Sequence, residues 1–208
     1  MKEKVTAIIS ALKDRYPDPV CALHYSKDYE LMIAVRLSAQ CTDARVNLVT
    51  PHLFAAYPTL ESMAGAPIEH IEQLVHSCGF YKHKARDIVL ACQMLLTEYG
   101  GKVPNTMEQL LRLPGVGRKT ANLLLGDLYN VPGSVVCDTH CIRICGRLGL
   151  TQGKEPEKVE MQLRKLLPPE ESSDFCHRIV LFGRDICTAR GPKCGACTLS
   201  PWCKEING

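Results

Sequence analysis

The stretch Leu113-Pro-Gly-Val-Gly-Arg-Lys-Thr-Ala121 interrupts a helical pattern near the middle of the chain. A capping-box pattern at residues 106–109 begins a short helix before it, and apolar residues return at helical spacing after it. Gly115 and Gly117 permit a tight turn and let another molecule approach the backbone closely. The turn leads into a new helix near Arg118, whose free N–H groups can bind phosphate. The stretch therefore predicts two helices joined by a glycine hairpin, with an ordinary corner between two helices as the alternative.

Apolar residues recur at helical spacing along nearly the whole chain. The segment Tyr29–Leu37 is almost entirely apolar and predicts a buried helix, although Arg36 interrupts it and must either pair with a buried acid or reach solvent. No stretch alternates convincingly as a strand, and Ser134–Cys137 is too short to count. Helices are expected at about residues 5–12, 29–37, 42–54, 67–78, 82–99, 106–112, 118–128, 138–148, 156–167 and 173–187. The predicted fold is all-α.

Length and composition limit the remaining possibilities. The 208 residues can form one large or two small domains, and Pro132-Gly133 is the best internal boundary. A net charge of +3 decides nothing by itself. The N-terminus has no apolar segment of the secretory type, and no apolar run is long enough to span a bilayer. We therefore expect a soluble, intracellular protein.

Four cysteines near the C-terminus form the strongest local pattern, Cys187-x6-Cys194-x2-Cys197-x5-Cys203. In a chain without an export signal, such dense spacing favours metal binding over disulfides. Thiolates suit iron–sulfur clusters or zinc. Because zinc ribbons usually have two C-x2-C pairs and this pattern has one, a [4Fe-4S] cluster is preferred to zinc.

The chain contains 12 cysteines, so eight lie outside this pattern. Cys137, Cys141 and Cys145 recur every four residues, which allows a second metal site, but Cys137 precedes the expected helix and core packing is favoured. The other five are scattered and are expected to act as small core residues. They are Cys21, Cys41, Cys78, Cys92 and Cys176.

Two residues have the chemistry of a reaction centre. Lys119 follows the hairpin, and its amine can attack only when neutral, although its free pKa is about 10.4. Burial and the positive end of a helix would both favour the neutral amine, while a phosphate-binding or surface lysine is the simpler alternative. Asp138 stands at the expected start of a helix, where it can serve as an N-cap, as a catalytic carboxylate, or as both.

Taken together, these motifs resemble the endonuclease III family of DNA glycosylase/AP lyases. The resemblance rests on LPGVGRKTAN at 113–122, CDTH at 137–140, LSAQCTD at 37–43 and the C-terminal cysteine spacing, and it covers nearly the whole chain. It implies a base excision repair enzyme that removes damaged bases, oxidised pyrimidines above all, and cleaves the abasic site by β-elimination. It also implies double-stranded DNA as the partner, a [4Fe-4S] cluster, a monomer without membrane contact, and a cytoplasmic location, at the nucleoid in a bacterium.

The resemblance also implies roles for individual residues. Lys119 matches the nucleophile that forms a Schiff base, and Asp138 matches the catalytic carboxylate. Gln40 matches a residue that enters the gap left by the flipped base, and Phe80 takes the place of an intercalating wedge, which is usually leucine in relatives. The implied DNA contacts are Gln40, Phe80, Gly115, Gly117, Arg118, Arg190 and Lys193, and the implied cluster ligands are Cys187, Cys194, Cys197 and Cys203.

The implied architecture has two helical domains with a DNA cleft between them. Residues 21–132 would form a domain ending in the helix-hairpin-helix, and residues 1–20 and 133–208 would form the iron–sulfur cluster domain, with Lys119 and Asp138 on opposite sides of the cleft. Two alternatives are a monofunctional mismatch glycosylase, whose relatives lack a lysine at position 119, and a non-catalytic iron–sulfur DNA-binding protein.

Overall fold

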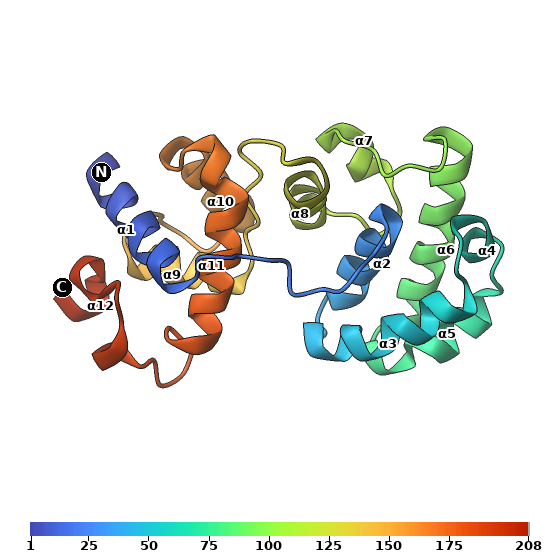
Figure 1. The fold of residues 1–208 in the computed structure, drawn as a ribbon, viewed down its shortest axis with the longest axis horizontal. Coiled ribbons are helices and arrows are strands. Elements are labelled where there is room, and N and C mark those ends of the chain that lie inside the picture. The colour runs from blue at the N-terminus through green and yellow to red at the C-terminus, as the bar shows by residue number, and fades with distance from the viewer. Residues whose placement is uncertain (208) are drawn as a thin grey trace. The chain divides into compact units, whose positions relative to one another are not determined.

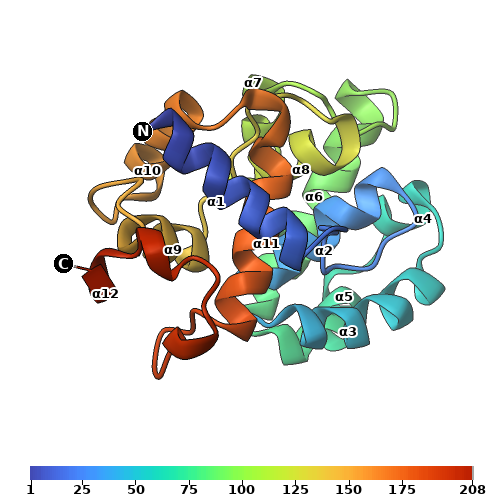
Figure 2. The same ribbon diagram turned by 60° about the vertical axis from the view of Figure 1, so that its left-hand side comes forward.

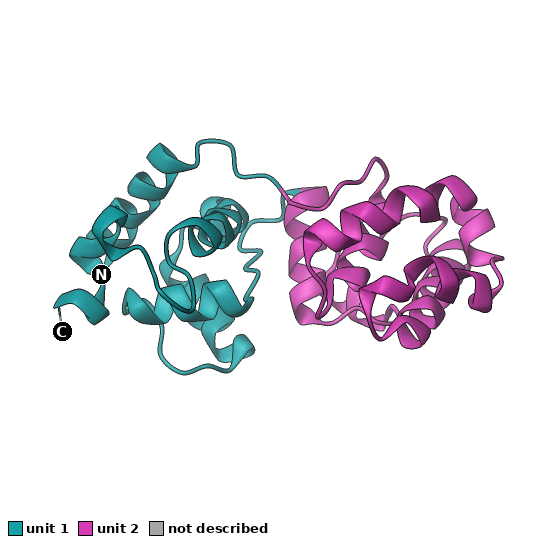
Figure 3. Cartoon of the chain, turned by 90° about the horizontal axis from the view of Figure 1, so that it is seen from below, with its two compact units in different colours: residues 1–20, 130–208 teal, residues 21–129 magenta. Residues whose placement is uncertain are grey.

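A computed structural model describes residues 1–207, and it contains helices, turns and irregular segments with no strand in that range. The all-α prediction is therefore confirmed. The chain divides into two compact units (Figure 3). We call Cys21–Tyr129 the hairpin unit, and Met1–Val20 with Asn130–Gly208 the cysteine-loop unit. Within the described range, no helix has the length and apolar character needed to cross a membrane.

The hairpin unit is built around one apolar helix, α2 (Asp28–Ser38), which is buried at eight of its eleven positions. Its start is fixed by Glu30, whose side chain accepts hydrogen bonds from the Ser26 and Lys27 amides at 2.8 and 3.3 Å. The surrounding elements are α3 (Asp43–Ala56), α4 (Leu60–Ala64), α5 (Ile68–Val75), the 3-10 turn η1 (His76–Cys78), α6 (Tyr81–Glu98), α7 (Met107–Arg112) and α8 (Arg118–Tyr129) (Figure 1). α2 packs against α3, α6 and α8, so it forms the centre of this unit.

Local sequence signals account for most helix ends in the hairpin unit. Thr42 caps α3 by accepting from the Arg45 amide at 3.2 Å. Thr106 caps α7 by accepting from the Gln109 amide, but the reciprocal half of the capping box is missing because the Gln109 side chain accepts from the Thr106 hydroxyl instead. At the other end of α7, Arg112 pairs with Glu98 of α6 at 2.6 Å. The caps therefore fix the ends of the two helices as the sequence predicted.

The cysteine-loop unit joins the first helix of the chain to its last third. It contains α1 (Lys2–Arg15), α9 (Thr139–Arg147), α10 (Pro156–Leu166), η2 (Pro169–Glu171), α11 (Ser172–Asp185), η3 (Cys194–Ala196), η4 (Ser200–Trp202) and α12 (Lys204–Asn207). The predicted apolar face of α1 is buried at Val5, Ile8, Ile9 and Leu12. α1 packs against α11, as Figures 1 and 2 show.

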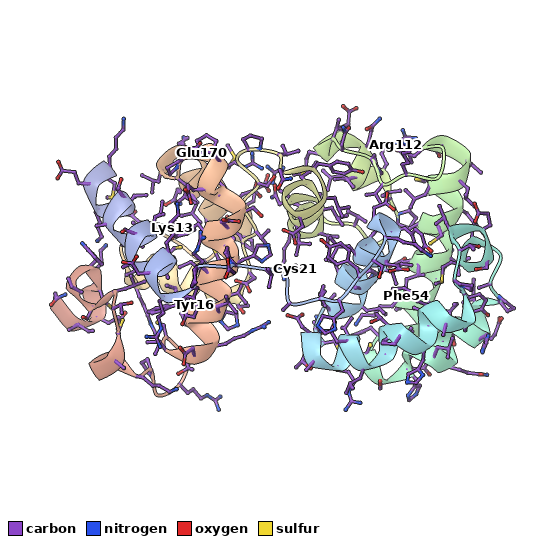
Figure 4. The ribbon with its side chains drawn as sticks, in the orientation of Figure 1. Lys13, Tyr16, Cys21, Phe54, Arg112 and Glu170 are labelled. Atoms are coloured by element: carbon purple, nitrogen blue, oxygen red, sulfur yellow. The ribbon has the colours of Figure 1, made fainter. Side chains whose placement is uncertain are left out.

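Polar contacts fasten the end of α1 to α11. Arg15 and Tyr16 both bind the Asp185 carboxylate, at 2.7 and 3.1 Å. The side chain of Lys13 pairs with Glu171, which ends η2 directly before α11. Figure 4 labels Lys13 and Tyr16 near the end of α1. Arg178 is almost fully buried and donates from Nε to the Tyr16 carbonyl at 3.0 Å. These contacts join residues about 160 positions apart in sequence.

Candidate functional site

The glycine hairpin forms as predicted and links α7 to α8. The Val116 amide donates to the Leu113 carbonyl at 3.1 Å, and α8 begins at Arg118. Gly115 has a φ of +75°, which favours glycine, whereas Gly117 does not need a positive φ. Both glycines are exposed, and no atom lies within 4 Å of the place where a Gly117 Cβ would be. The backbone at Gly117 is therefore open to a close approach from outside.

An ion pair lies directly beneath Gly115 and explains the arginine that interrupts the α2 pattern. Arg36 donates to Asp87 of α6 from Nε at 2.8 Å and from Nη2 at 2.6 Å, and both side chains are largely covered. A Cβ on Gly115 would lie 2.4 Å from Arg36 Nε and 2.7 Å from the Asp87 carboxylate. Arg36 therefore pairs with an acid, and the hairpin needs glycine at position 115 for space as well as for its φ.

The two expected reaction residues both lie at helix N-termini. Lys119 is the second residue of α8 and is exposed, so the protein itself does not provide the desolvation that the sequence suggested for its amine. Asp138 is the N-cap of α9, where its Oδ1 accepts from the Cys141 amide at 2.7 Å. Asp138 is half-buried, and Lys119 belongs to the hairpin unit while Asp138 belongs to the cysteine-loop unit.

Gln40 and Phe80 lie on two separate loops of the hairpin unit. Gln40 follows the end of α2 with a φ of +55°, and Phe80 precedes α6 with a φ of +47°. Both residues are exposed, and Phe80 retains 63% of its surface, so it is not a core residue. An aromatic ring left in solvent on a left-handed backbone is an unusual arrangement that suits a role in binding.

Lys84 was not predicted from the sequence, and it contacts both of these loops. Lys84 is 1% exposed, and its Nζ lies 2.8 Å from each of the carbonyl oxygens of Leu37, Ala39 and Cys78. Its sequence neighbours, Lys82 to Arg86, resemble a solvated basic stretch. One signal was available, because Lys84 falls on the same helical face as the buried Ile88, Cys92 and Leu95.

All four predicted ligand cysteines line one open pocket. From α9, Arg147 donates to the Cys187 sulfur and to the Thr188 carbonyl, both at 3.2 Å. From the same helix, Arg143 donates to the Cys187 carbonyl at 2.8 Å. Within residues 187–207, only Leu199 is buried, so this segment has no apolar core of its own. Arg143 and Arg147, which hold the start of this segment, were not predicted from the sequence.

The remaining cysteines have ordinary surroundings. Cys137, Cys141 and Cys145 are buried in the core of the cysteine-loop unit, as is Cys176. The pKa of Cys141 is raised, first by hydrogen bonding to the neighbouring thiols of Cys137, Cys145 and Cys176 and then by burial. Cys137 precedes α9, and Cys141 and Cys145 lie one turn apart within it, so the three thiols pack in the core of this unit.

The two predicted basic contacts of the cysteine loop are both exposed. Arg190 precedes Gly191, which has a φ of +63°, and Lys193 lies 3.7 Å from Asp185 in an ion pair whose lysine is 63% exposed. Exposed pairs of this kind are weak, so Lys193 remains able to bind an external anion.

Comparison with known proteins identifies the class. Residues 33–169, which include the hairpin, Lys119 and Asp138, match the family model of the HhH-GPD superfamily of base excision DNA repair proteins. The fold and the hairpin therefore define a member of this superfamily.

Close relatives narrow the assignment to one family. The chain is 44% identical to the endonuclease III of Synechocystis over 97% of its length and 92% of that protein, and 38% identical to the Escherichia coli enzyme over 98% and 96%. It also matches the solved structure of a trapped endonuclease III–DNA covalent intermediate with a TM-score of 0.93 and 41% identity, covering 100% of this chain and 97% of the other. The chain belongs to the endonuclease III family.

Proposed function

We propose that this protein is a bifunctional DNA glycosylase and AP lyase that removes damaged bases through a lysine Schiff base. The observation that carries the proposal is Lys119, an exposed amine at the N-terminus of α8 immediately after the glycine hairpin. A lysine so placed is next to a backbone that can bind a DNA phosphate. The family relationship supports the same chemistry, since one similar structure is that of a covalent intermediate with DNA.

In the proposed reaction, the Lys119 Nζ lone pair attacks C1′ of the damaged nucleotide. The bond from C1′ to the base breaks, and the base leaves with its electron pair and takes up a proton. Asp138 stabilises the positive charge that develops on the sugar and accepts a proton from the attacking amine. Opening of the sugar ring then gives the Schiff base, and loss of a C2′ proton breaks the bond from C3′ to the phosphate oxygen. This β-elimination cleaves the strand 3′ to the lesion.

The exposed loops supply the DNA contacts in this proposal. Gln40 and Phe80 enter the stack so that the damaged base can leave it, because a base inside a duplex cannot be attacked. Phosphates are bound by the amides at Gly115, Gly117 and Arg118. Arg190 and Lys193 bind further phosphates from the cysteine loop.

The cysteine loop suits an iron–sulfur cluster. Four soft donors, Cys187, Cys194, Cys197 and Cys203, line one pocket of a segment that has almost no core of its own. When bound, a [4Fe-4S] cluster would supply the iron–thiolate bonds that fix the shape of this loop. Arg147 would donate to one ligand sulfur, and Arg190 and Lys193 would be held in position for DNA.

Each of the two domains supplies a different part of the proposed active site. Residues 21–132 provide the hairpin and the nucleophile, and residues 1–20 with 133–208 provide the carboxylate and the cluster loop. Oxidised pyrimidines in double-stranded DNA are the proposed substrates, and a bacterial cell would hold the protein at its nucleoid.

Borohydride trapping on a duplex with one abasic site tests the central claim. The wild-type protein should form a covalent complex, and Lys119→Gln should form none, because the glutamine side chain lacks the amine that condenses with the sugar and is then reduced onto it. Lys102→Gln, an exposed lysine of the same unit, is the matched control and should trap normally. Base removal by the wild-type protein without trapping would identify a monofunctional glycosylase instead. DNA binding without either activity would identify a non-catalytic DNA-binding protein.

A further inference from the structure

Lys84 is the largest fully buried polar side chain of the hairpin unit, and the reaction proposed above does not use it. Its Nζ lies 2.8 Å from three carbonyl oxygens, those of Leu37, Ala39 and Cys78. An ammonium has three N–H donors and no acceptor, so three carbonyls satisfy it completely. Burial lowers the pKa of Lys84, and the nearby Cys41 and Cys78 thiols oppose that shift. A buried charge of this kind is costly unless it is fully hydrogen-bonded, as it is here.

The three carbonyls come from two segments that are far apart in sequence. Leu37 and Ala39 end α2 and lead directly to Gln40, while Cys78 ends η1 and leads through Gly79 to Phe80. Among the described residues, no backbone–backbone hydrogen bond joins residues 37–41 to residues 76–80. The Lys84 amine is therefore a polar link between the loop that carries Gln40 and the loop that carries Phe80, alongside the side-chain hydrogen bond between the Cys41 and Cys78 thiols.

Both loops hold a strained backbone at the residue they present. Gln40, Phe80 and Asn130 are the three non-glycine residues of the described chain with a positive φ, and two of them lie in these loops. Such conformations are energetically costly and persist only where the surroundings enforce them. Lys84 fixes the carbonyl of the residue just before Gln40 and that of the residue two before Phe80, so it helps to enforce both.

We propose that Lys84 is a positioning residue that holds the Gln40 and Phe80 loops in a fixed relation, so that both side chains enter an opened duplex together. The inference rests on the proposed function of Gln40 and Phe80. Lys84 itself touches no DNA, because it is buried beneath the loops. A misplacement of about 1 Å in a group that positions a substrate can lower a rate on the order of 100-fold.

A double-mutant cycle tests this inference. Lys84→Met keeps the length of the side chain and removes all three N–H donors. Lys82→Met is the matched control, since it makes the same substitution two residues earlier on α6 at an exposed position. Lys84→Met should lower base excision from a lesion duplex by about 10- to 100-fold, and Lys82→Met should change it less than about 3-fold. Lys84→Arg, which keeps charge and donors, should recover part of the loss.

Coupling to the two loops separates positioning from a general effect on folding. In a Gln40→Ala, Phe80→Ala background, Lys84→Met should lower base excision by less than about a further 3-fold, because the side chains that Lys84 positions are absent. 2-Aminopurine placed opposite the lesion should brighten when the wild-type protein opens the stack and should brighten less with Lys84→Met. If Lys84→Met does not fold, Lys84→Gln replaces it in the same cycle.

The outcomes distinguish this inference from the proposed function. A wild-type protein that neither excises bases nor traps abasic DNA contradicts the proposed function. The role assigned to Lys84 is overturned if the wild-type protein is active but Lys84→Met lowers base excision equally with and without the Gln40 and Phe80 side chains. An unchanged 2-aminopurine signal in Lys84→Met overturns it as well.

Discussion

At the scale of single residues, Asp138 combines a structural contact with a proposed chemical role. One of its oxygens accepts from the Cys141 amide at 2.7 Å and so caps α9. Asn caps helices about as well as Asp does. The free energy of unfolding of Asp138→Asn should therefore lie within about 0.5 kcal/mol of the wild-type value. Base excision should fall by at least about 100-fold, because the negative charge and proton acceptor are lost. Thermal unfolding and single-turnover excision measure the two effects.

The matched control for this change is Asp138→Ala, which removes the cap as well as the charge. It should lose about 1 kcal/mol of stability in addition to its activity. Near-normal excision by Asp138→Asn would show that the residue is only a cap.

Cys92 on α6 provides a residue-scale prediction about pH. It is fully buried, and burial raises the pKa of its thiol to about 12. In the unfolded chain this thiol ionises near its ordinary pKa, so above about pH 9 the unfolded state binds fewer protons and stability falls as pH rises. Cys92→Ala lacks this contribution. The difference in free energy of unfolding between the wild-type protein and Cys92→Ala should therefore shrink by about 1.5–2 kcal/mol between pH 7.5 and pH 10. Urea titrations at the two pH values measure this difference.

Leu95→Ala serves as the control for the thiol. Leu95 is equally buried on the same helix and does not ionise, so its deficit should be the same at both pH values. A Cys92→Ala deficit that stays constant with pH would contradict the raised pKa.

The partners of single buried polar residues could not be predicted from the sequence. The pattern placed Arg36 on an apolar helix and could not identify its partner, because Asp87 lies 51 residues away and meets it only in the folded unit. Lys84 was missed for the same reason, since three backbone carbonyls that satisfy a lysine leave no trace in side-chain chemistry. Lys119 and Asp138 were noticed because helix-start signals surround them, although their roles come from the family and stay predictions.

At the scale of elements, the two hairpin glycines should respond differently to substitution. Gly115→Ala forces a positive φ on alanine and places a methyl group 2.4 Å from Arg36 Nε, so it should destabilise the protein by about 1–3 kcal/mol. Gly117→Ala meets no atom within 4 Å and should leave stability nearly unchanged. Urea unfolding of both variants measures the difference.

DNA affinity then tests what the hairpin is for. Gly117→Ala should weaken duplex binding by about 10-fold, because a methyl group keeps a phosphate away from the hairpin amides. Undiminished binding by a stable Gly117→Ala would place the phosphate contact elsewhere.

Helices with clear start signals were the predictable part of the fold. Thr42, Thr106 and Asp138 all cap the helices that they were expected to begin. The missed α4 spans only Leu60–Ala64, which is too short for an apolar period to show, and its capping pair of Thr59 and Ser62 lacks the usual Glu or Gln. Short elements of this kind depend on packing, which in α4 is provided by α6.

At the scale of the whole molecule, the cysteine loop should depend on its metal. Purified protein should contain about four irons per chain if the proposed cluster is correct. Cys194→Ser should lose iron and weaken DNA binding, because residues 187–207 bury only Leu199 and cannot keep their shape alone. Metal analysis and limited proteolysis of the C-terminal segment measure both effects.

A serine at another cysteine provides the control for cluster loss. Cys21→Ser changes a half-buried thiol of the hairpin unit and should leave iron content and C-terminal protease resistance unchanged. Zinc without iron in anaerobically purified protein would contradict the cluster assignment, and a protease-resistant, iron-free Cys194→Ser would contradict its role in shaping the loop.

The division of the chain also constrains how the protein is made. The hairpin unit is complete once residue 129 has been synthesised, whereas α1 packs against α11, which ends at Asp185. At about 5–20 residues per second, roughly 10–30 s separate the release of α1 from that of its partner helix. During this interval the ribosome carries a folded middle and an N-terminal helix whose apolar stripe is uncovered. α1 is therefore among the last helices of this chain to find its partner, and chaperones on the nascent chain have a long time to bind it.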